Sequence, residues 1–496
     1  MMQEHLTVME QLIQTQQNVM AAYLAARQGA ATSPAAPPAR RFPFFHDVVE
    51  VVPGVRSVAR HQFSSEREIL FHHHTLGRDV SLEDPSLLGL PMVPLTVTME
   101  ILAEGAALLE PNKLLVGMGD IRATRWIMLE QPGFTIEATA RQTAPGEVHV
   151  ALREAGAPGT LRPILAEAVA VFAESYPDSG PPRPFVLENE KRSAWLPEQL
   201  YRTGMFHGAL MQGSKSIERA GRNGCSGTLE ALPHTELFAG DPQPLFLFDP
   251  VLLDAAGQVV AYWFWEALEK GTDLFPYRVA AFHCYAPAPP TGSQLECRVV
   301  RRFESDKVIH SDIEVLDRAG KVYYRLENWE TRRFPQPPRF LRLRIDPRAT
   351  YIGTPLKDLK RGVSGCRVDD LPQEFLESSH GIWLKALAYL VLNRRERAAW
   401  EGMQAPPKER YDWLLSRCAA KDAVRMLIHE RFGEQLCAAD VEIVTDGSTR
   451  ATTAGAWKQR LGVNPAVALA HKGLPAAVAA FDPADLAGID LGVRAA

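Results

Sequence analysis

The chain has 496 residues, of which 46% are hydrophobic and 23% charged, with 54 Lys and Arg against 59 Asp and Glu. At roughly one domain per 150 residues, this length predicts about three domains. The composition is ordinary for a folded globular protein, and the formal net charge of -5 lacks the basic excess that nucleic acid attracts. We therefore expect no nucleic-acid partner.

The sequence shows no pattern of export or of disulfide bonding. Runs of about 18 uncharged apolar residues, which a membrane span requires, do not occur, and Glu4 and His5 stand where a signal peptide carries basic residues. The six cysteines form no Cys-x-x-Cys pair, so neither a zinc ribbon nor a disulfide framework is indicated. We expect a soluble protein of the reducing cytoplasm, without membrane contact.

The first expected element is a helix within residues 1–28. Its apolar side chains recur near helical spacing, at Leu6, Met9, Leu12, Ile13, Met20, Tyr23 and Leu24. The segment 29–42 that follows is a linker rich in Pro and Ala, which is extended and leaves the helix without a nearby core. This arrangement predicts docking or homodimerisation through the helix, and packing of the helix on the body of the chain is the alternative.

One pattern occurs twice within residues 43–335: an irregular start, one apolar helix and several strands. The helices are expected at about 96–109 and 250–268. Segments that alternate apolar and polar residues, typical of half-buried strands, follow them at 134–141 and 295–300. Strands gathered around one helix in each copy predict an α+β fold, with copies at 43–180 and 181–335 packed side by side.

A second linker is expected at 336–371, because prolines and several arginines there leave few side chains that could fill a core. A third, smaller domain of α/β type follows at 372–496. It is predicted to be helical from about 372 to 431 and then to contain short apolar stretches at 466–470 and 476–481.

Three adjacent histidines, His72 to His74, precede Thr75-Leu76-Gly77 and form the first candidate for chemistry. Histidine titrates near pH 6.5, so an imidazole accepts a proton at neutral pH without prior activation. A solvated strand end is one alternative. A metal site is another, although no third ligand lies close in the sequence.

Asp254 is the second candidate, because it stands among apolar and small residues of the second helix. Burial in such surroundings raises a carboxyl pKa and keeps the acid form available. Gln258 lies one turn further on the same helical face and could hydrogen-bond this carboxyl. Capping of the helix is already supplied by Asp249 before Pro250. A histidine base paired with the Asp254 acid would suit removal of an α-proton and loss of a β-hydroxyl.

Four motifs within residues 43–335 form a specific combination. They are His74-Thr75-Leu76-Gly77, Gly89 to Pro94 leading into Met99 to Glu104, Phe206-His207-Gly208 with Gln212-Gly213, and Asp249-Pro250-x-x-Leu253-Asp254-x-x-x-Gln258. On these motifs the segment resembles the double-hotdog dehydratase domain of modular polyketide synthases. The resemblance implies two antiparallel sheets, each wrapped round a helix. It also implies removal of water from a 3-hydroxyacyl thioester on an acyl carrier protein to give the 2,3-enoyl thioester, with no cofactor.

The resemblance implies a role for each site residue. His74 is the base, Asp254 is the acid with Gln258 in support, and the Gly77 amide lies near the thioester carbonyl, where it stabilises enolate-like charge. The usual family spacing has glycine four residues after the histidine, which here fits His73. His74 is preferred because it precedes Thr-Leu-Gly as in a related synthase subgroup, and His73 remains the alternative base.

The third domain carries a second resemblance. The segments that match are Arg394 to Arg397, Tyr411 to Arg425, Ala468-Leu469-Ala470-His471 and Gly488-Ile489-Asp490. On these it resembles the N-terminal lobe of two-lobed phosphopantetheinyl transferases, which implies a coenzyme A contact for His471 and Mg²⁺ binding for Asp490. Gly492 replaces the glutamate of the family, and the sequence as given ends at Ala496, before the position where the second lobe of the family would follow. Coenzyme A and Mg²⁺ are therefore expected only if the lobe is functional, and carrier-protein binding is the alternative.

The leading hypothesis is a dehydratase subunit of a polyketide or polyketide-like fatty acid synthase, with an acyl carrier protein and other synthase subunits as partners. The alternatives are a non-catalytic acyl-binding scaffold and a phosphopantetheinyl transferase. A buried Asp254 argues against a pure scaffold, because a buried carboxyl without a task is costly. Hydrolase chemistry is unsupported, because Gly-x-Ser-x-Gly does not occur.

Overall fold

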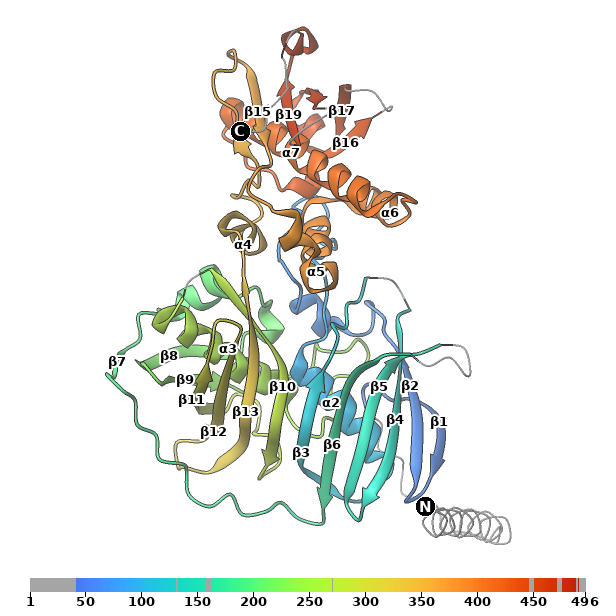
Figure 1. The fold of residues 1–496 in the computed structure, drawn as a ribbon, viewed down its shortest axis with the longest axis vertical. Coiled ribbons are helices and arrows are strands. Elements are labelled where there is room, and N and C mark those ends of the chain that lie inside the picture. Colours follow the sequence, from blue (N-terminus) through green and yellow to red (C-terminus); the bar gives the residue numbers. More distant parts are fainter. Residues whose placement is uncertain are drawn as a thin grey trace, which may run out of the picture. The chain divides into compact units, whose positions relative to one another are not determined.

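Two buried helices are each followed by a set of antiparallel strands (Figure 1). The computed structural model describes residues 42–130, 133–156, 162–269, 271–445, 450–470, 475–487 and 489. The expected helix within 1–28 lies outside these residues, so docking or dimerisation through it stays a prediction.

The first copy is built around helix α2 (Leu95–Ala107), whose thirteen residues are all buried. A helix that is buried on every side needs cover on every side, and strands supply much of it here. The strands of this copy are β1 (Asp47–Val52), β2 (Arg56–Gln62), β3 (Leu114–Ala123), β4 (Thr135–Ala144), β5 (Glu147–Glu154) and β6 (Ile164–Ala173). The helix and the alternating strand at 134–141 are confirmed.

The second copy is built around helix α3 (Pro250–Ala267), which Asp249 caps by accepting the Leu252 amide at 2.9 Å. Its strands are β7 (Lys191–Arg192), β8 (Ser214–Gly221), β9 (Gly224–Glu230), β10 (Thr272–Cys284), β11 (Gln294–Glu304), β12 (Val308–Leu316) and β13 (Val322–Pro335). Short helical turns precede β8, at Pro197–Gln199, Leu200–Gly204 and Ala209–Met211.

The two copies have the same strand order, which confirms the α+β double-hotdog prediction. From the outer edge inwards the first copy runs β1-β2-β4-β5-β6-β3, and the second runs β7-β8-β9-β11-β12-β13-β10. In both copies the strand that follows the helix lies innermost. These two strands, β3 and β10, pair antiparallel, so the two sheets join edge to edge into one sheet of thirteen strands.

The C-terminal region is a six-stranded antiparallel sheet with helices. The sheet order is β14-β15-β19-β18-β17-β16, and the long helix α7 contacts β15 and β19. Its strands are β14 (Thr354–Pro355), β15 (Val363–Arg367), β16 (Glu442–Thr445), β17 (Arg450–Ala454), β18 (Ala466–Leu469) and β19 (Ala476–Ala480). Its helices are α4 (Pro338–Ile345), α5 (Gln373–Val391), α6 (Arg394–Glu401), α7 (Pro407–Phe432) and α8 (Trp457–Leu461).

The structure differs from the expected linker at 336–371, because this segment is largely folded. It contains α4, and its strand β15 pairs with β19 inside the C-terminal sheet. One of the arginines on which the linker prediction was based is buried. Arg344 forms an ion pair with Asp273, and Gln336 donates a hydrogen bond to the same carboxylate at 2.7 Å. Residues from Phe42 onward belong to one compact unit.

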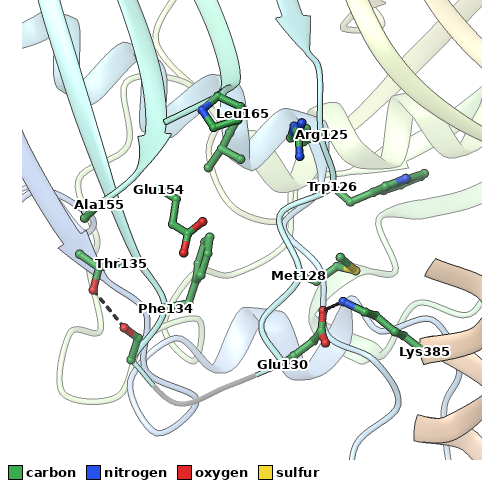
Figure 2. A pocket seen from close by; sticks show the side chains of 12 residues that line it. Arg125, Trp126, Met128, Glu130, Phe134, Thr135, Glu154, Ala155, Leu165 and Lys385 are labelled. Atoms are coloured by element: carbon green, nitrogen blue, oxygen red, sulfur yellow. Dashed lines mark hydrogen bonds and ion pairs between the residues drawn. The ribbon is translucent and has the colours of Figure 1, made fainter. Parts of the chain in front are cut away.

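Helix α5 meets the first copy at an ion pair. Lys385 Nζ lies 2.5 Å from Glu130 Oε1, and both residues line a cavity of about 600 Å³ together with Arg125, Trp126 and Met128 (Figure 2). None of the candidate site residues named above lines this cavity. The C-terminal region therefore contacts the first copy directly.

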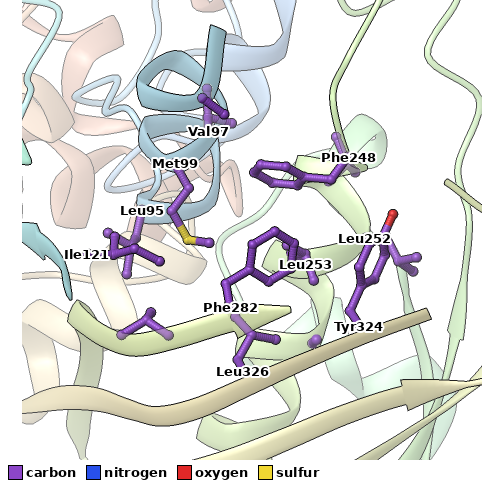
Figure 3. Packing of buried hydrophobic residues seen from close by; sticks show 14 of the residues in the cluster. Leu95, Val97, Met99, Ile121, Phe248, Leu252, Leu253, Phe282, Tyr324 and Leu326 are labelled. Atoms are coloured by element: carbon purple, nitrogen blue, oxygen red, sulfur yellow. The ribbon is translucent and has the colours of Figure 1, made fainter. Parts of the chain in front are cut away.

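The core between α2 and α3 is made of large apolar side chains. Figure 3 shows Leu95, Val97 and Met99 of α2 facing Phe248, Leu252 and Leu253 at the start of α3, with Ile121, Phe282, Tyr324 and Leu326 from the strands. Burial of side chains of this size contributes roughly 1.5–3 kcal/mol each, so this interface is a main source of stability for the double hotdog.

Two carboxyls of the Met99 to Glu104 motif are buried in this core. Glu104 Oε2 accepts the amides of Phe44 and Phe45 at 3.1 and 3.2 Å, and Glu100 Oε1 accepts the Leu247 amide at 2.7 Å. Burial raises the pKa of Glu100 to about 8 and raises that of Glu104. Glu104 thus holds the segment that enters the first copy, and Glu100 holds the segment that leads into α3.

Among the described residues, no helix is both long and apolar enough to cross a bilayer.

The junction of β3 and β10 can be tested with a matched pair of glycines. A Cβ on Gly117 would lie 2.7 Å from the Phe282 carbonyl oxygen across the junction, whereas the nearest atom to a Cβ on Gly119 is the Ala280 carbonyl oxygen at 4.0 Å. We expect Gly117→Ala to lower the free energy of unfolding by about 1–3 kcal/mol and Gly119→Ala to leave it nearly unchanged. Urea unfolding of both variants checks this, and equal effects would contradict the described register.

Candidate active site

His74 is held at the end of a short helical turn, Ile69–His73, where the chain passes alongside Pro91 and Met92. Its backbone carbonyl accepts the Met92 amide at 3.1 Å, and its ring Nδ1 lies 2.9 Å from the Met92 carbonyl oxygen. Because a carbonyl only accepts hydrogen bonds, Nδ1 carries the proton and Nε2 keeps its lone pair. The ring is therefore oriented as a base.

Asp254 lies in the first turns of α3, with its side chain 13% exposed. Gln258 Nε2 donates to Asp254 Oδ2 at 2.9 Å and also to the Met211 carbonyl at 3.0 Å. The Tyr201 hydroxyl donates to Gln258 Oε1 at 2.6 Å, which fixes the orientation of the amide. The hydrogen bond expected between Gln258 and Asp254 is thus present.

His207 is a third member of the site. Its Nε2 lies 3.2 Å from Asp254 Oδ2, and its ring stacks on Phe206 at 4.5 Å between centroids. Its Nδ1 is buried and has no hydrogen-bond partner among the described residues. Sequence reasoning used Phe206-His207-Gly208 as a motif and gave His207 no role. The sequence feature that could have identified His207 is an imidazole inside a motif of the second copy.

The structure brings together residues from both copies. Ligand-type atoms of His74, His207 and Asp254 all lie within 4.8 Å of one another, and the two imidazole centroids are 5.1 Å apart. His74 comes from the first copy, and the other two come from the second. Within the described part of the chain this is the only such cluster of three. Two imidazoles and a carboxylate are also ligand types that a divalent metal accepts.

The protonation of His74 follows from its burial. Desolvation lowers its pKa to about 4, although the nearby Asp254 charge opposes the shift. His74 is therefore neutral at pH 7, the state that a base requires.

The expectation for the Asp254 pKa is wrong in sign. Burial alone raises the pKa of this carboxyl, but the hydrogen bond from His207 and the charges of His207 and His74 outweigh burial, so the pKa lies below its usual value. The sequence could not reveal this, because His207 and His74 are distant from Asp254 along the chain. At neutral pH the Asp254 carboxyl is therefore ionised and by itself holds no proton that it could donate.

His73 and Gly77 are placed differently from His74. A Cβ on Gly208 would lie 2.3 Å from His73 Nδ1, so the His73 ring packs on the Gly208 backbone. The cluster contains His74 and not His73. The Gly77 amide donates to the Thr75 carbonyl at 2.8 Å, so it is already engaged and does not support the expected contact with a thioester.

A cavity of about 390 Å³ borders the cluster at His207. It is also lined by His73, by Gly208 and by a stretch of chain that follows Gly77, with Arg78, Val80, Leu87 and Gly89 among its residues. This is a space that a small acyl thioester group could enter.

His471 and Asp490 lie outside the described residues, so their expected contacts with coenzyme A and Mg²⁺ stay predictions. The matches reported below include no phosphopantetheinyl transferase, and the transferase-like lobe is without support from them.

The buried neutral His74 predicts a pH dependence of stability. A histidine of the unfolded chain titrates near 6.5 and His74 in the folded protein near 4, so the unfolded state binds more protons between these values. Stability contributed by neutral His74 is present above pH 6.5 and is lost as the pH falls towards 4. From pH 7 to pH 4 the wild type should lose up to about 3 kcal/mol more than His74→Gln in urea unfolding. Parallel pH profiles of the two proteins would contradict this.

Comparison with known proteins gives one family match and several structural likenesses. Residues 180–340 match the family model described as "Polyketide synthase dehydratase N-terminal domain". No curated protein matches the sequence. Among solved structures, the dehydratase domain of RzxB from Pseudomonas fluorescens is 16% identical, with 58% of this chain and 98% of that chain covered and a TM-score of 0.44.

Two dehydratase domains of the curacin polyketide synthase are similar to the same extent. The CurF domain is 16% identical, with 59% of this chain and 98% of that chain covered and a TM-score of 0.43. The CurJ domain is 13% identical, with 60% and 98% covered and a TM-score of 0.44. These likenesses are too weak to assign roles to residues. The family match covers the segment 180–340, which holds His207 and Asp254, and it is a likeness over that segment alone.

Proposed function

We propose that the protein removes water from a 3-hydroxyacyl thioester carried on an acyl carrier protein and releases the 2,3-enoyl thioester. The observation that carries this proposal is the close approach of His74 to Asp254 and His207, across the two copies of the double hotdog. A neutral base and a proton-holding pair on facing elements are what removal of an α-proton and loss of a β-hydroxyl require.

The base in this proposal is Nε2 of His74. It takes the α-proton of the thioester, and the electrons of the broken C–H bond form the new carbon–carbon double bond. The lowered pKa of His74 keeps the ring neutral before the step. The hydrogen bond from Nδ1 to the Met92 carbonyl, 2.9 Å long, stabilises the imidazolium that forms.

The acid in this proposal is the hydrogen-bonded pair of Asp254 and His207. The β-carbon–oxygen bond breaks, and the departing hydroxyl takes a proton from the pair and leaves as water. The lowered pKa of Asp254 leaves its carboxyl ionised at neutral pH. We therefore assign the transferred proton to His207 Nε2, 3.2 Å from the carboxylate. His74 then carries one additional proton and the pair lacks one. Transfer between them, within the 4.8 Å cluster, restores the site.

Gln258 and Tyr201 position the acid. Gln258 donates to the Asp254 oxygen that faces His207, and Tyr201 fixes Gln258 in turn. This chain of hydrogen bonds holds the carboxylate in one rotamer. A fixed orientation of the acid raises the rate of the reaction. The reaction needs no redox cofactor and no metal. The carrier protein and other synthase subunits are the proposed partners, and a cytoplasmic location stays a prediction.

The roles of the two adjacent histidines can be separated by substitution. We expect His74→Gln and Asp254→Asn each to lower kcat/KM for a 3-hydroxyacyl carrier-protein thioester by about 100-fold to 10,000-fold, the usual contribution of acid and base groups. His73→Gln is the matched control and should retain most of the activity. Formation of the enoyl product is followed by mass spectrometry. Equal conversion by the wild type and Asp254→Asn would show that Asp254 is not the acid, and no conversion by the wild type would support a non-catalytic acyl-binding scaffold instead.

Removal of His207 should change the pH dependence of the reaction. In His207→Gln the proton must reside on Asp254 itself, which loses the hydrogen bond that stabilises its charged form. We expect kcat/KM at pH 7 to fall by at least about tenfold and the optimum to move to lower pH, where more Asp254 is protonated. Initial rates across the pH range provide the measurement. An unshifted optimum would show that His207 does not hold the proton.

A further inference from the structure

The stretch from Arg78 to Pro91, here called the 78–91 loop, connects the segment that follows His74 to the segment that orients its ring. Its first half follows His74-Thr75-Leu76-Gly77 directly, and its last residues lead to Met92, whose carbonyl bonds the ring of His74. Residues of the loop also line the cavity that borders His207. The position of this loop therefore affects the space next to the candidate active site.

The apolar side of the loop is buried in the C-terminal region. Val80, Leu87 and Leu90 of the loop, and Leu76 just before it, belong to the same buried cluster as residues of α4, α5 and α7, and not to the core around α2 and α3. A Cβ on Gly77 would lie 2.3 Å from a methyl carbon of Leu390 in α5. The chain next to His74 thus packs on the C-terminal region.

The polar side of the loop is held by a carboxylate of the C-terminal region. Asp440, which ends a short helical turn after α7, accepts hydrogen bonds from the Ser81 hydroxyl, from the Leu82 amide at 3.1 Å and from the Glu83 amide at 3.3 Å. Asp440 is 5% exposed. Charge-assisted bonds of this kind in a buried place are stronger than neutral ones.

A carboxylate of the loop makes the reciprocal contact. Glu83 accepts the amides of Ala456, at 2.7 Å, and Trp457 at the start of helix α8. These amides have no partner within the helix, and the carboxylate is well placed to satisfy them. Trp457 in turn donates from its ring to the Asp440 carbonyl at 3.1 Å. Each side therefore satisfies backbone donors of the other.

Two arginines add contacts further along the loop. Arg394 donates to the Asp84 carboxylate and to the Ser86 hydroxyl, both at 2.7 Å, and Arg397 donates to the Leu88 carbonyl at 2.8 Å. The Arg394 pair is exposed and contributes little by itself. The contacts extend over most of the loop, from Ser81 to Leu88.

We infer that the C-terminal region positions the 78–91 loop as a wall of the dehydratase cavity, with Asp440 and Glu83 as the positioning residues. The inference rests on the proposed function, because the cavity matters only if substrate enters it. It gives the C-terminal region a role inside the dehydratase that needs neither coenzyme A nor Mg²⁺. Asp440 contacts no reacting atom, so its effect is on the binding of substrate and not on proton transfer.

The test compares two buried aspartates of the full-length chain. Asp440→Asn keeps the shape of the side chain but removes its charge and places an amide group among backbone donors. Asp422→Asn is the matched control: Asp422 is also buried and accepts the Ile352 and Gly353 amides at 2.7 and 2.9 Å, all inside the C-terminal region. Glu83→Gln tests the contact from the loop side.

Three measurements are made on each variant: hydrogen exchange of residues 78–91, kcat and KM with a 3-hydroxyacyl carrier-protein thioester, and the pH profile of kcat/KM. For Asp440→Asn and Glu83→Gln we expect about tenfold faster exchange in the loop and about a tenfold higher KM. Changes of this size are expected because each variant loses the equivalent of one charge-assisted hydrogen bond. We also expect kcat within about threefold of wild type and an unchanged pH profile. Asp422→Asn should leave exchange in the loop and KM unchanged, even if its melting temperature falls equally.

The outcomes separate this inference from the proposed function. Unchanged exchange in the loop would overturn the role of Asp440, and faster exchange with an unchanged KM would overturn the role of the loop in substrate binding. An equal rise of KM in Asp422→Asn would reduce the effect to general destabilisation and would also overturn the inference. A wild-type chain that forms no enoyl product overturns the proposed function, while hydrogen exchange still decides whether Asp440 holds the loop.

Discussion

The pairing of β3 with β10 is the constraint on which the arrangement of the site depends. These strands are the innermost of the two copies, and their antiparallel register, with Ile121 opposite Val279, joins the copies into one sheet. Helix α3, which carries Asp254, leads into β10, and the chain after β3 pairs with the segment around Met92 that holds the His74 ring. An acid and a base from copies far apart in sequence are thereby brought within reach of each other.

Within this frame the electrostatics are decided by a few buried contacts. Burial outweighs the nearby Asp254 charge and makes His74 neutral, and a hydrogen bond from a second imidazole keeps Asp254 charged despite its burial. The same core uses Glu100 and Glu104 differently, since their carboxyls accept backbone amides and their pKa values are raised by burial. Buried acids of similar appearance in the sequence thus have opposite shifts.

The C-terminal region shares buried apolar and ionic contacts with the double hotdog. Its apolar cluster includes side chains that flank the histidine segment, and its buried Arg344 pairs with Asp273 of β10. A composition of prolines and arginines suggested a linker there, because exposed arginines are the common case. Arg344 is instead neutralised by Asp273 of the second hotdog copy, which no local pattern in the sequence could reveal.

By itself the sequence determined the central helix of each copy and the alternating strand at 134–141, because their apolar periodicity is local, and it determined the duplication, because the pattern occurs twice. It also identified Asp254 as unusual and predicted its bond to Gln258, since residues four apart on a helix are neighbours. Only the tertiary structure decided that His74 and not His73 faces Asp254, that His207 joins them, and that the Gly77 amide is engaged. These three features depend on contacts between segments that are distant in the sequence. Such contacts also decide the pKa of a side chain and whether a backbone amide is free to bind a substrate, so neither can be read from a local pattern.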